Sequence, residues 1–277
     1  MFRIFPQWCL FIPLVLLFHN VQAQSAPGAK SYMGIGTGLH YGYLRDAGVS
    51  PLTYRGPLLH GQANFFFDRE KWDYDLELGF GYGSYEAARS FRVASVVNNV
   101  QHSFGALRDL WANPIGSLTL DAALSYRGFT NYRTTTAFRN NANVWESLHS
   151  LLAGARFQWD IHLNRSGGKT LFFKRKGGER HLRLSTQALL PLLHGSWRPG
   201  FAYLEDFTGG DRQVGAANVL SWGGFRAYGR VEGWYFLRNG NAWRLSYALD
   251  LQQGKPGINR LQTAQYFTQI GLFARLN

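Results

Sequence analysis

Along residues 72–83, the side chains alternate between two kinds: every second one is apolar or aromatic, and those between are acidic or glycine. Successive side chains of an extended strand point to opposite faces. The segment is therefore predicted to be a strand with one apolar face and one polar or bare face. The same alternation recurs in five further segments, which are 33–41, 118–127, 151–162, 182–188 and 243–252.

Weaker signals raise the predicted number of strands to ten. Residues 59–67, 98–109 and 265–276 lack a clean phase, and residues 217–237 are interpreted as one long strand. The connections alternate in length, which is typical of a barrel with short periplasmic turns, long extracellular loops and both chain ends in the periplasm. The short connections are 68–71, 110–115 and 238–241, and the longer ones are 44–57, 84–97, 128–146, 193–212 and 254–262.

One connection breaks this rule. Residues 164–180 fall where a short turn is expected, yet they are long and basic, with Lys174, Arg175 and Lys176 in sequence. A hairpin that pairs residues 170–173 with residues 180–184 would give twelve strands instead of ten.

Composition favours a membrane environment for these strands. Aromatic residues make up 16% of the chain and glycine 32 of its 277 residues. A transmembrane barrel uses aromatics as interfacial girdles, and glycine suits a crowded interior. We predict a single antiparallel, up-and-down, ten-stranded transmembrane β-barrel over residues 24–277. The alternative is a soluble periplasmic β-sandwich or lipocalin-like binder, which would need the apolar faces turned inward.

Residues 1–23 are predicted to be a cleaved signal peptide. Arg3 supplies the positive start, residues 10–18 form a short apolar run, and residues 21–23 form a small-x-small cleavage site. The one cysteine, Cys9, lies inside this segment. The mature chain therefore has no disulfide, thiol chemistry or cysteine metal site, and it is predicted to be exported to the cell outer membrane.

The chain is basic, with a formal net charge of +12, or +11 once Arg3 is removed with the signal peptide. Such a charge often indicates nucleic acid binding, but export argues against it. The expected partners are outer-membrane lipid and lipopolysaccharide, whose phosphates carry the opposite charge. No cofactor is expected: no Cys/His cluster has metal-site spacing, and Gly34-x-Gly36-x-Gly38 is followed by strand-like alternation and not by a helix.

The predicted strand phases place seven acidic side chains and seven arginines inside the barrel. A narrow barrel cannot leave buried charges unpaired without a cost of about several kcal/mol each, and the arginine fork suits bidentate pairing with carboxylates. We therefore expect a lumen filled by ion pairs, which argues against a wide pore. The acids are Asp73, Asp75, Glu77, Asp121, Asp160, Glu232 and Asp250, and the bases are Arg127, Arg156, Arg183, Arg226, Arg230, Arg244 and Arg275.

As a whole, residues 24–277 resemble small bacterial outer-membrane β-barrel proteins as a class. The resemblance implies insertion by the outer-membrane assembly machinery, although the chain ends at Asn277 where many members have a terminal aromatic residue. The first functional hypothesis is a non-enzymatic one. It is an integral protein with a narrow or plugged lumen, which serves envelope structure, surface binding or small-solute passage.

Two constellations support the alternative of an outer-membrane hydrolase. Asp73-Tyr74-Asp75 and Asp160-Ile161-His162 resemble the Asp-x-Asp and Asp-x-His pairs of the omptin proteases. A histidine poised by a carboxylate can activate water. The predicted topology puts both pairs near the periplasmic end, whereas omptins act at the outer rim, so ion pairing inside the lumen is the favoured interpretation.

His194-Gly195-Ser196 resembles the lipid-facing His-x-Ser pair of outer-membrane lipid hydrolases. A serine nucleophile needs a base and a third group that orients the base; Glu205 and Asp206 are the candidates for that third role. Pro199, however, makes the segment look like a loop. The adjacent pairs His102-Ser103 and His149-Ser150 lack the spacing that points two side chains to one face.

Overall fold

A computed structural model of the chain shows an all-β protein. The predicted signal peptide lies outside the residues that the structure describes. The described residues are 30–46, 52–69, 71–87, 90–113, 117–135, 143–165, 168–170, 173–175, 178–199, 218–254 and 261–276.

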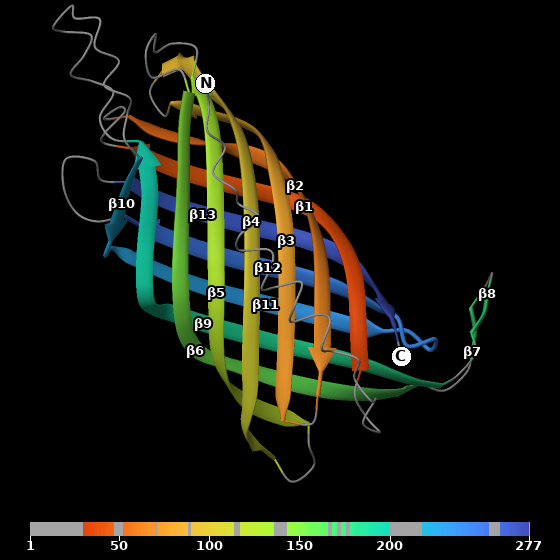
Figure 1. Cartoon of the computed structure of the whole chain (residues 1–277). Helices are drawn as coiled ribbons and strands as arrows, with labels where there is room; N and C mark the ends of the chain where they lie inside the picture. Colours follow the sequence, from red (N-terminus) through yellow and green to blue (C-terminus); the bar gives the residue numbers. More distant parts are fainter. Residues whose placement is uncertain are drawn as a thin grey trace, which may run out of the picture.

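Ten long strands close into one antiparallel ring (Figure 1). Each strand of the ring pairs with its neighbours in the sequence, and β1 closes the ring against β13. The ten-stranded up-and-down barrel predicted from the alternation is therefore confirmed. Its strands are β1 (Lys30–Asp46), β2 (Thr53–Asp68), β3 (Trp72–Ala87), β4 (Ser90–Ala112), β5 (Leu118–Thr135), β6 (Asn143–Arg165), β9 (Gly178–Pro199), β11 (Phe225–Phe236), β12 (Ala242–Gln253) and β13 (Leu261–Arg275).

The hairpin that would have raised the count to twelve lies outside the ring. β7 (Gly168–Thr170) pairs with β8 (Phe173–Arg175) in a sheet of their own, which stands away from the barrel in Figure 1. The predicted pairing of residues 170–173 with 180–184 is wrong, because β9 begins at Gly178 and pairs with β6 instead.

The segment predicted as one strand over residues 217–237 is interrupted. β10 (Asn218–Trp222) and β11 both pair with β9, but Gly223 and Gly224 separate them with φ angles of 106° and 107°. Residues with a side chain rarely adopt such positive φ values. The glycine pair also switches the face of the strand: Ser221 points inward on β10, whereas Arg226 points inward on β11.

The strands run further toward the outer end than the sequence indicated. β1 continues to Asp46 and β3 to Ala87, so both enter ranges predicted as loops. At that end the apolar side chains turn to the inside, as Leu44 and Leu148 do. Where the outer face meets water instead of lipid, apolar residues are no longer needed outside. The alternation that marks a lipid-facing strand therefore disappears although the strand continues.

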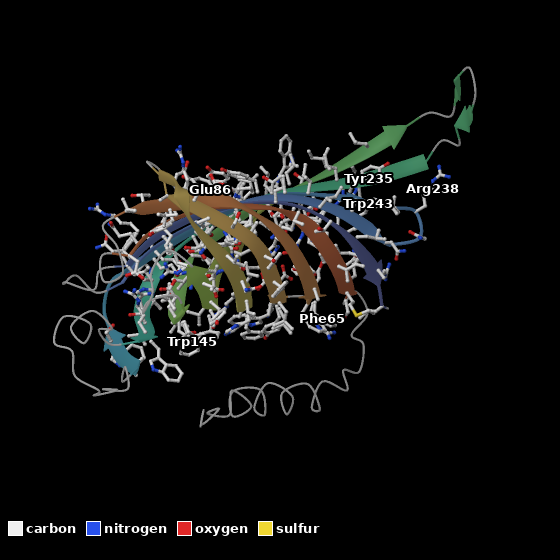
Figure 2. All side chains as sticks on the ribbon, turned by 90° about the horizontal axis from the view of Figure 1, so that it is seen from above. Phe65, Glu86, Trp145, Tyr235, Arg238 and Trp243 are labelled. Atoms are coloured by element: carbon white, nitrogen blue, oxygen red, sulfur yellow. The ribbon has the colours of Figure 1, made fainter. Side chains whose placement is uncertain are left out.

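Inside the membrane band, the wall has an apolar outer face and a mainly polar inner face. Ile35, Leu39 and Leu59 are exposed on the outside, whereas Gln62 and Asn64 are buried inside. The three segments with weak signals also have one face toward the lumen and one face outward. The inward positions are the even-numbered ones on β2 and the odd-numbered ones on β4 and β13. Figure 2 shows side chains on both faces of the wall, with Phe65 and Trp145 on the face that points away from the lumen.

Three apolar clusters lie inside the barrel at different heights. Charged side chains lie between and beside them: Arg244 lies over the rings of Trp234 and Phe273, and Arg127 lies over the ring of Tyr228. Among the described residues, no helix is long and apolar enough to cross a membrane. The outer cluster holds Leu44, Tyr54, Leu58, Tyr85, Ala87, Val97, Phe129, Leu148 and Leu261; the middle one Leu107, Ala123, Leu152, Leu189, Tyr228, Ala248 and Phe267; and the periplasmic one Tyr32, Trp234, Ala242 and Phe273.

Candidate functional site: the charged lumen and its surroundings

Arg156 holds two carboxylates from across the barrel. Its side chain on β6 contacts Asp73 of β3, and its Nε lies 2.6 Å from Oδ2 of Asp121 on β5. All three side chains are buried. The two carboxylates together balance more than the one positive charge, and the fork of Arg156 supplies a separate donor to each of them.

Arg230 on β11 is the centre of a second group. Its guanidinium lies 3.1 Å from Asp75, 3.4 Å from Glu77 and 3.3 Å from Glu232. Glu232 also contacts Arg244 at 3.3 Å. Three acids and two arginines from β3, β11 and β12 thus form one connected network that crosses the lumen.

The arginines nearer the middle are held differently. Arg226 forms a bidentate pair with Asp250, at 3.0 Å from Nε and 2.6 Å from Nη2, and also donates to the backbone oxygen of Arg127 at 2.9 Å. Arg127 itself lies over the ring of Tyr228 at 3.7 Å. Within the described part of the chain, no carboxylate is at ion-pair distance from Arg127, so a cation–π contact takes the place of the expected ion pair.

The residues of the predicted protease-like pairs have separate partners in the described part of the chain. Asp160 accepts from Nε2 of His181 at 2.6 Å and from Nε of Arg183 at 2.9 Å. His162 is exposed and stacks on His181 with ring centres 4.9 Å apart. Together with the ion pair of Asp73 to Arg156, these contacts place all of these carboxylates in cationic surroundings near the periplasmic end.

Arg275, predicted to point inward, lies exposed at the periplasmic rim. It lines an open hollow of about 390 Å³ at this mouth of the barrel, together with Lys30, Asp68, His181 and Arg238. Arg275 is in phase with the inward residues of β13, as predicted. The strand ends at this residue, however, so its side chain projects beyond the wall of the barrel.

His194 and Ser196 point into the barrel and not toward lipid. The segment is part of strand β9 and not a loop. Both side chains are buried: Nδ1 of His194 lies 2.8 Å from Oγ of Ser150, and Oγ of Ser196 lies 2.8 Å from Oγ of Ser221. A bulge at Leu192 shifts the register against β6 and reverses the face of β9. The candidate third groups, Glu205 and Asp206, lie outside the described residues.

Sequence reasoning missed a buried ion-pair quartet at the outer end. Arg133 contacts Asp46 at 2.6 Å and Glu146 at 3.3 Å, and Arg198 contacts the same two carboxylates at 2.6 Å and 3.5 Å. Asn131 also donates to Glu146 at 2.8 Å. These residues lay in or beside predicted loops, so their inward phase could have been found only by continuing the alternation past the membrane band.

Empty space is unevenly distributed around these groups: an open hollow of about 200 Å³ borders Asp73, Arg156 and Arg183. The cavity among the central arginines, next to Glu77 and Trp234, has a volume of about 20 Å³. That is room for roughly one or two water molecules. Among the described residues, no group of three or more His, Cys, Asp and Glu is placed to hold a metal ion.

No family model matches the chain, and no curated protein matches its sequence. The outer-membrane protease OmpT of Escherichia coli is similar in structure, with 9% identity over 92% of this chain and 99% of that one and a TM-score of 0.51. The translocator domain of the autotransporter NalP of Neisseria meningitidis shares 10% identity over 97% and 95%, with a TM-score of 0.41. Neisserial surface protein A shares 8% identity over 89% and 98%, with a TM-score of 0.36.

The chain therefore has the fold of the bacterial outer-membrane β-barrel proteins. At these identities the likeness shows the fold alone. It defines no single family within that class and transfers no activity to this chain.

Proposed function

We propose that this chain is a non-conducting integral protein of the outer membrane, whose lumen is structural and whose function resides on its outer surfaces. The observation that carries the proposal is the filling of the central lumen by side chains. Three apolar clusters and the ion-paired groups centred on Arg156, Arg230 and Arg226 occupy it. An ion on its way through would have to displace buried ion pairs and pass between apolar side chains, and each of these steps costs about several kcal/mol.

The apolar outer face of the barrel supports the proposed location in a membrane. Large apolar side chains are exposed all around the wall, among them Ile35, Leu59 and Leu245. A soluble protein rarely exposes a contiguous apolar surface of this extent, whereas lipid covers it at no cost. Export by the signal peptide, insertion by the assembly machinery and contact with lipid and lipopolysaccharide belong to this proposal. A surface-binding role would be carried by the strand ends beyond the membrane.

Substitution of Ile35 by arginine tests the lipid contact. Ile35 on β1 is 72% exposed, so the change would cost almost nothing in water. A charge on the lipid face of a barrel costs about 2–4 kcal/mol near the midplane. We expect Ile35→Arg to lower the free energy of unfolding from lipid bilayers by about 2 kcal/mol, as measured by urea titration of tryptophan fluorescence.

The matched control is Ser84→Arg, which adds the same side chain to an outward position of β3 near its outer end. It is expected to change the free energy of unfolding by less than about 0.5 kcal/mol. Equal, small effects of both substitutions would contradict a lipid-facing wall and favour the soluble alternative.

Single-channel recording in planar bilayers tests the closed lumen. We expect no stable conductance steps from protein whose folding has been shown by heat-modifiable gel mobility. Liposomes that contain the protein should likewise not swell in isotonic solutions of small sugars. Reproducible open steps on the order of a nanosiemens, or sugar-dependent swelling, would show an open pore and reject the proposal.

A further inference from the structure

Five polar side chains form a hydrogen-bonded chain on the outer face of β4, β5 and β6. Oγ1 of Thr130 lies 2.8 Å from Oγ of Ser147, and Oγ of Ser147 lies 2.8 Å from Nε2 of His149. Nδ1 of His149 lies 2.7 Å from the hydroxyl of Tyr126, which lies 3.4 Å from Nε2 of His102. Serine, histidine and a third polar group thus follow one another in the order that nucleophilic hydrolysis requires.

The alternation places this cluster outside the barrel. On β6, the neighbours of Ser147 and His149 in the sequence, Leu148 and Ser150, are buried in the lumen. On β5, Arg127 is likewise buried inside, next to the outward Tyr126. Adjacent side chains of a strand point to opposite faces, so Ser147, His149 and Tyr126 face lipid.

The cluster lies at the outer edge of the apolar band. One position further out on β5 and β6 are Tyr132 and Trp145, and one position toward the periplasm is Leu151. Tyrosine and tryptophan mark the level of the lipid headgroups. The hydroxyl of Ser147 therefore lies at the depth of the acyl ester groups of the outer leaflet.

Glycines on both neighbouring strands shape the surroundings of His149. Gly128 faces it on β5 and Gly195 on β9. The ring of His102 occupies the space above Gly128, where a Cβ atom would come within 2.2 Å of Nε2. Any side chain at position 128 would displace His102 from the cluster, so the bare backbone there is a requirement of this arrangement.

Ser147 is 3% exposed. Trp197 is its direct neighbour on β9, and the indole of Trp197 packs edge-on against Trp145 with ring centres 4.9 Å apart. These two indoles lie beside Ser147 toward the outer end of the barrel, and the indole of Trp222 lies above Gly195, next to His149. Rotation of the indole of Trp197 would open a path for a lipid to Ser147, and a rotamer change of this kind needs no movement of the strands.

We propose that Ser147, His149 and Tyr126 form a lipid-facing site that hydrolyses acyl esters of the outer leaflet. Ser147 and His149 are the catalytic residues, and Tyr126 is a positioning residue that accepts from Nδ1–H of His149. This tautomer leaves Nε2 free to take the proton of Ser147. The site is independent of whether the lumen conducts.

The chemistry balances with water as the one co-reactant. Oγ of Ser147 attacks the ester carbonyl carbon while its proton moves to Nε2 of His149. The bond from the carbonyl carbon to the alcohol oxygen then breaks, and His149 returns the proton to that oxygen. Water, deprotonated by His149, attacks the acyl-serine, which releases the fatty acid and restores the hydroxyl of Ser147.

The test uses the full-length protein purified from outer membranes in detergent. Two substrates separate the two sources of acyl esters: phosphatidylethanolamine vesicles and purified lipopolysaccharide. Mass spectrometry follows the released fatty acid. A fluorophosphonate probe, which modifies activated serines, gives a readout that does not depend on the natural substrate. We expect fatty acid release from one of the two lipids and a mass increase on the peptide that contains Ser147.

Ser147→Ala and His149→Ala are expected to lower fatty acid release about 100-fold or more and to remove the labelling. Tyr126→Phe should lower kcat about tenfold at an unchanged KM, because it removes only the acceptor that orients His149. Ser84→Ala, an exposed outward serine on β3, is the matched control and should leave release unchanged. All variants are first checked for heat-modifiable mobility.

Release and labelling that persist in Ser147→Ala would overturn the proposal. So would the absence of both from folded wild-type protein, provided that Trp197→Ala, which uncovers Ser147, is inactive as well. A kcat of Tyr126→Phe equal to that of the wild type would remove the positioning role of Tyr126.

Discussion

Replacement of Arg230 by methionine is expected to lower the free energy of unfolding by about 3–5 kcal/mol. Arg230 contacts Asp75, Glu77 and Glu232 inside the barrel. Glu232 keeps its contact with Arg244 in the variant, whereas Asp75 and Glu77 lose their arginine. Among the described residues, these two carboxylates then have no partner at ion-pair distance, and removal of one partner from a buried ion pair is far more costly than removal of both.

The measurement is urea-induced unfolding from bilayers, followed by tryptophan fluorescence. Arg108→Met is the matched control, since Arg108 is exposed on the outer wall and lies over Trp72 at 5.6 Å; a loss below about 1 kcal/mol is expected there. The triple variant Arg230→Met, Asp75→Asn, Glu77→Gln should regain most of the stability, because neutral amides need no counter-ion. A triple variant as unstable as Arg230→Met would show that the arginine acts by packing and not by charge.

Between the two aromatic girdles, the sequence predicted which side chains point into the lumen. Lipid on one side of a strand demands an apolar face, so Asp73 and Asp75 had to point inward. The structure places them there, with Asp73 at Arg156 and Asp75 at Arg230. The sequence did not predict which arginine pairs with which carboxylate. Such pairs join strands on different sides of the ring, and the stagger of the closed barrel sets their relative heights.

At two local irregularities, the sequence does not predict which side chains point into the lumen. The bulge at Leu192 turns His194 and Ser196 inward, and the pair Gly223 and Gly224 reverses β10 against β11. One extra residue or two positive φ angles are enough to exchange the two faces of a strand. Pro191 and the two glycines are the only marks of these sites in the sequence, and each is also compatible with a loop.

The lipid-facing serine was missed for a different reason. In the motif of the outer-membrane lipid hydrolases a histidine stands two residues before a serine, whereas Ser147-x-His149 has the reverse order. Both orders place the two side chains on one face of a strand. The third member, Tyr126, lies on the neighbouring strand and becomes adjacent only through the register of β5 with β6. The alternation along β6 therefore predicts that Ser147 and His149 share one face, but it does not predict the contact with Tyr126.

The outer end of the barrel depends on the quartet in which Arg133 and Arg198 share Asp46 and Glu146. Asp46 ends β1 beyond the outward Tyr41 and Tyr43 of the outer girdle, next to the exposed Arg45, so it lies outside the membrane band. Burial by itself would raise the pKa of Asp46, but the guanidinium groups of Arg198 and Arg133 outweigh it and hold the pKa below its ordinary value. Asp46 therefore stays charged in the folded protein at pH values where it is protonated in the unfolded chain.

A carboxylate with a lowered pKa stabilises the fold above the pKa of the unfolded chain, and the contribution is lost as the pH falls through the folded value. Asp46→Asn is accordingly expected to cost about 3–5 kcal/mol at neutral pH, because two buried arginines then share Glu146 alone. The difference from the wild type should begin to shrink as the pH falls below about 4, where Asp46 of the unfolded chain takes up a proton, and should vanish once the pH falls below the lowered pKa of the folded protein.

Urea titrations between neutral and acidic pH test this expectation, with hydrogen exchange at the outer end of β1 as a local readout. Glu86→Gln is the matched control, since Glu86 is an exposed, outward carboxylate at the same end of the barrel; a change below about 0.5 kcal/mol at every pH is expected for it. A cost of Asp46→Asn that stays constant with pH would mean that the quartet stabilises the outer end by packing and hydrogen bonding and not by charge. A cost that fades with acid would mean that its charges close the barrel on the side facing the surroundings of the cell.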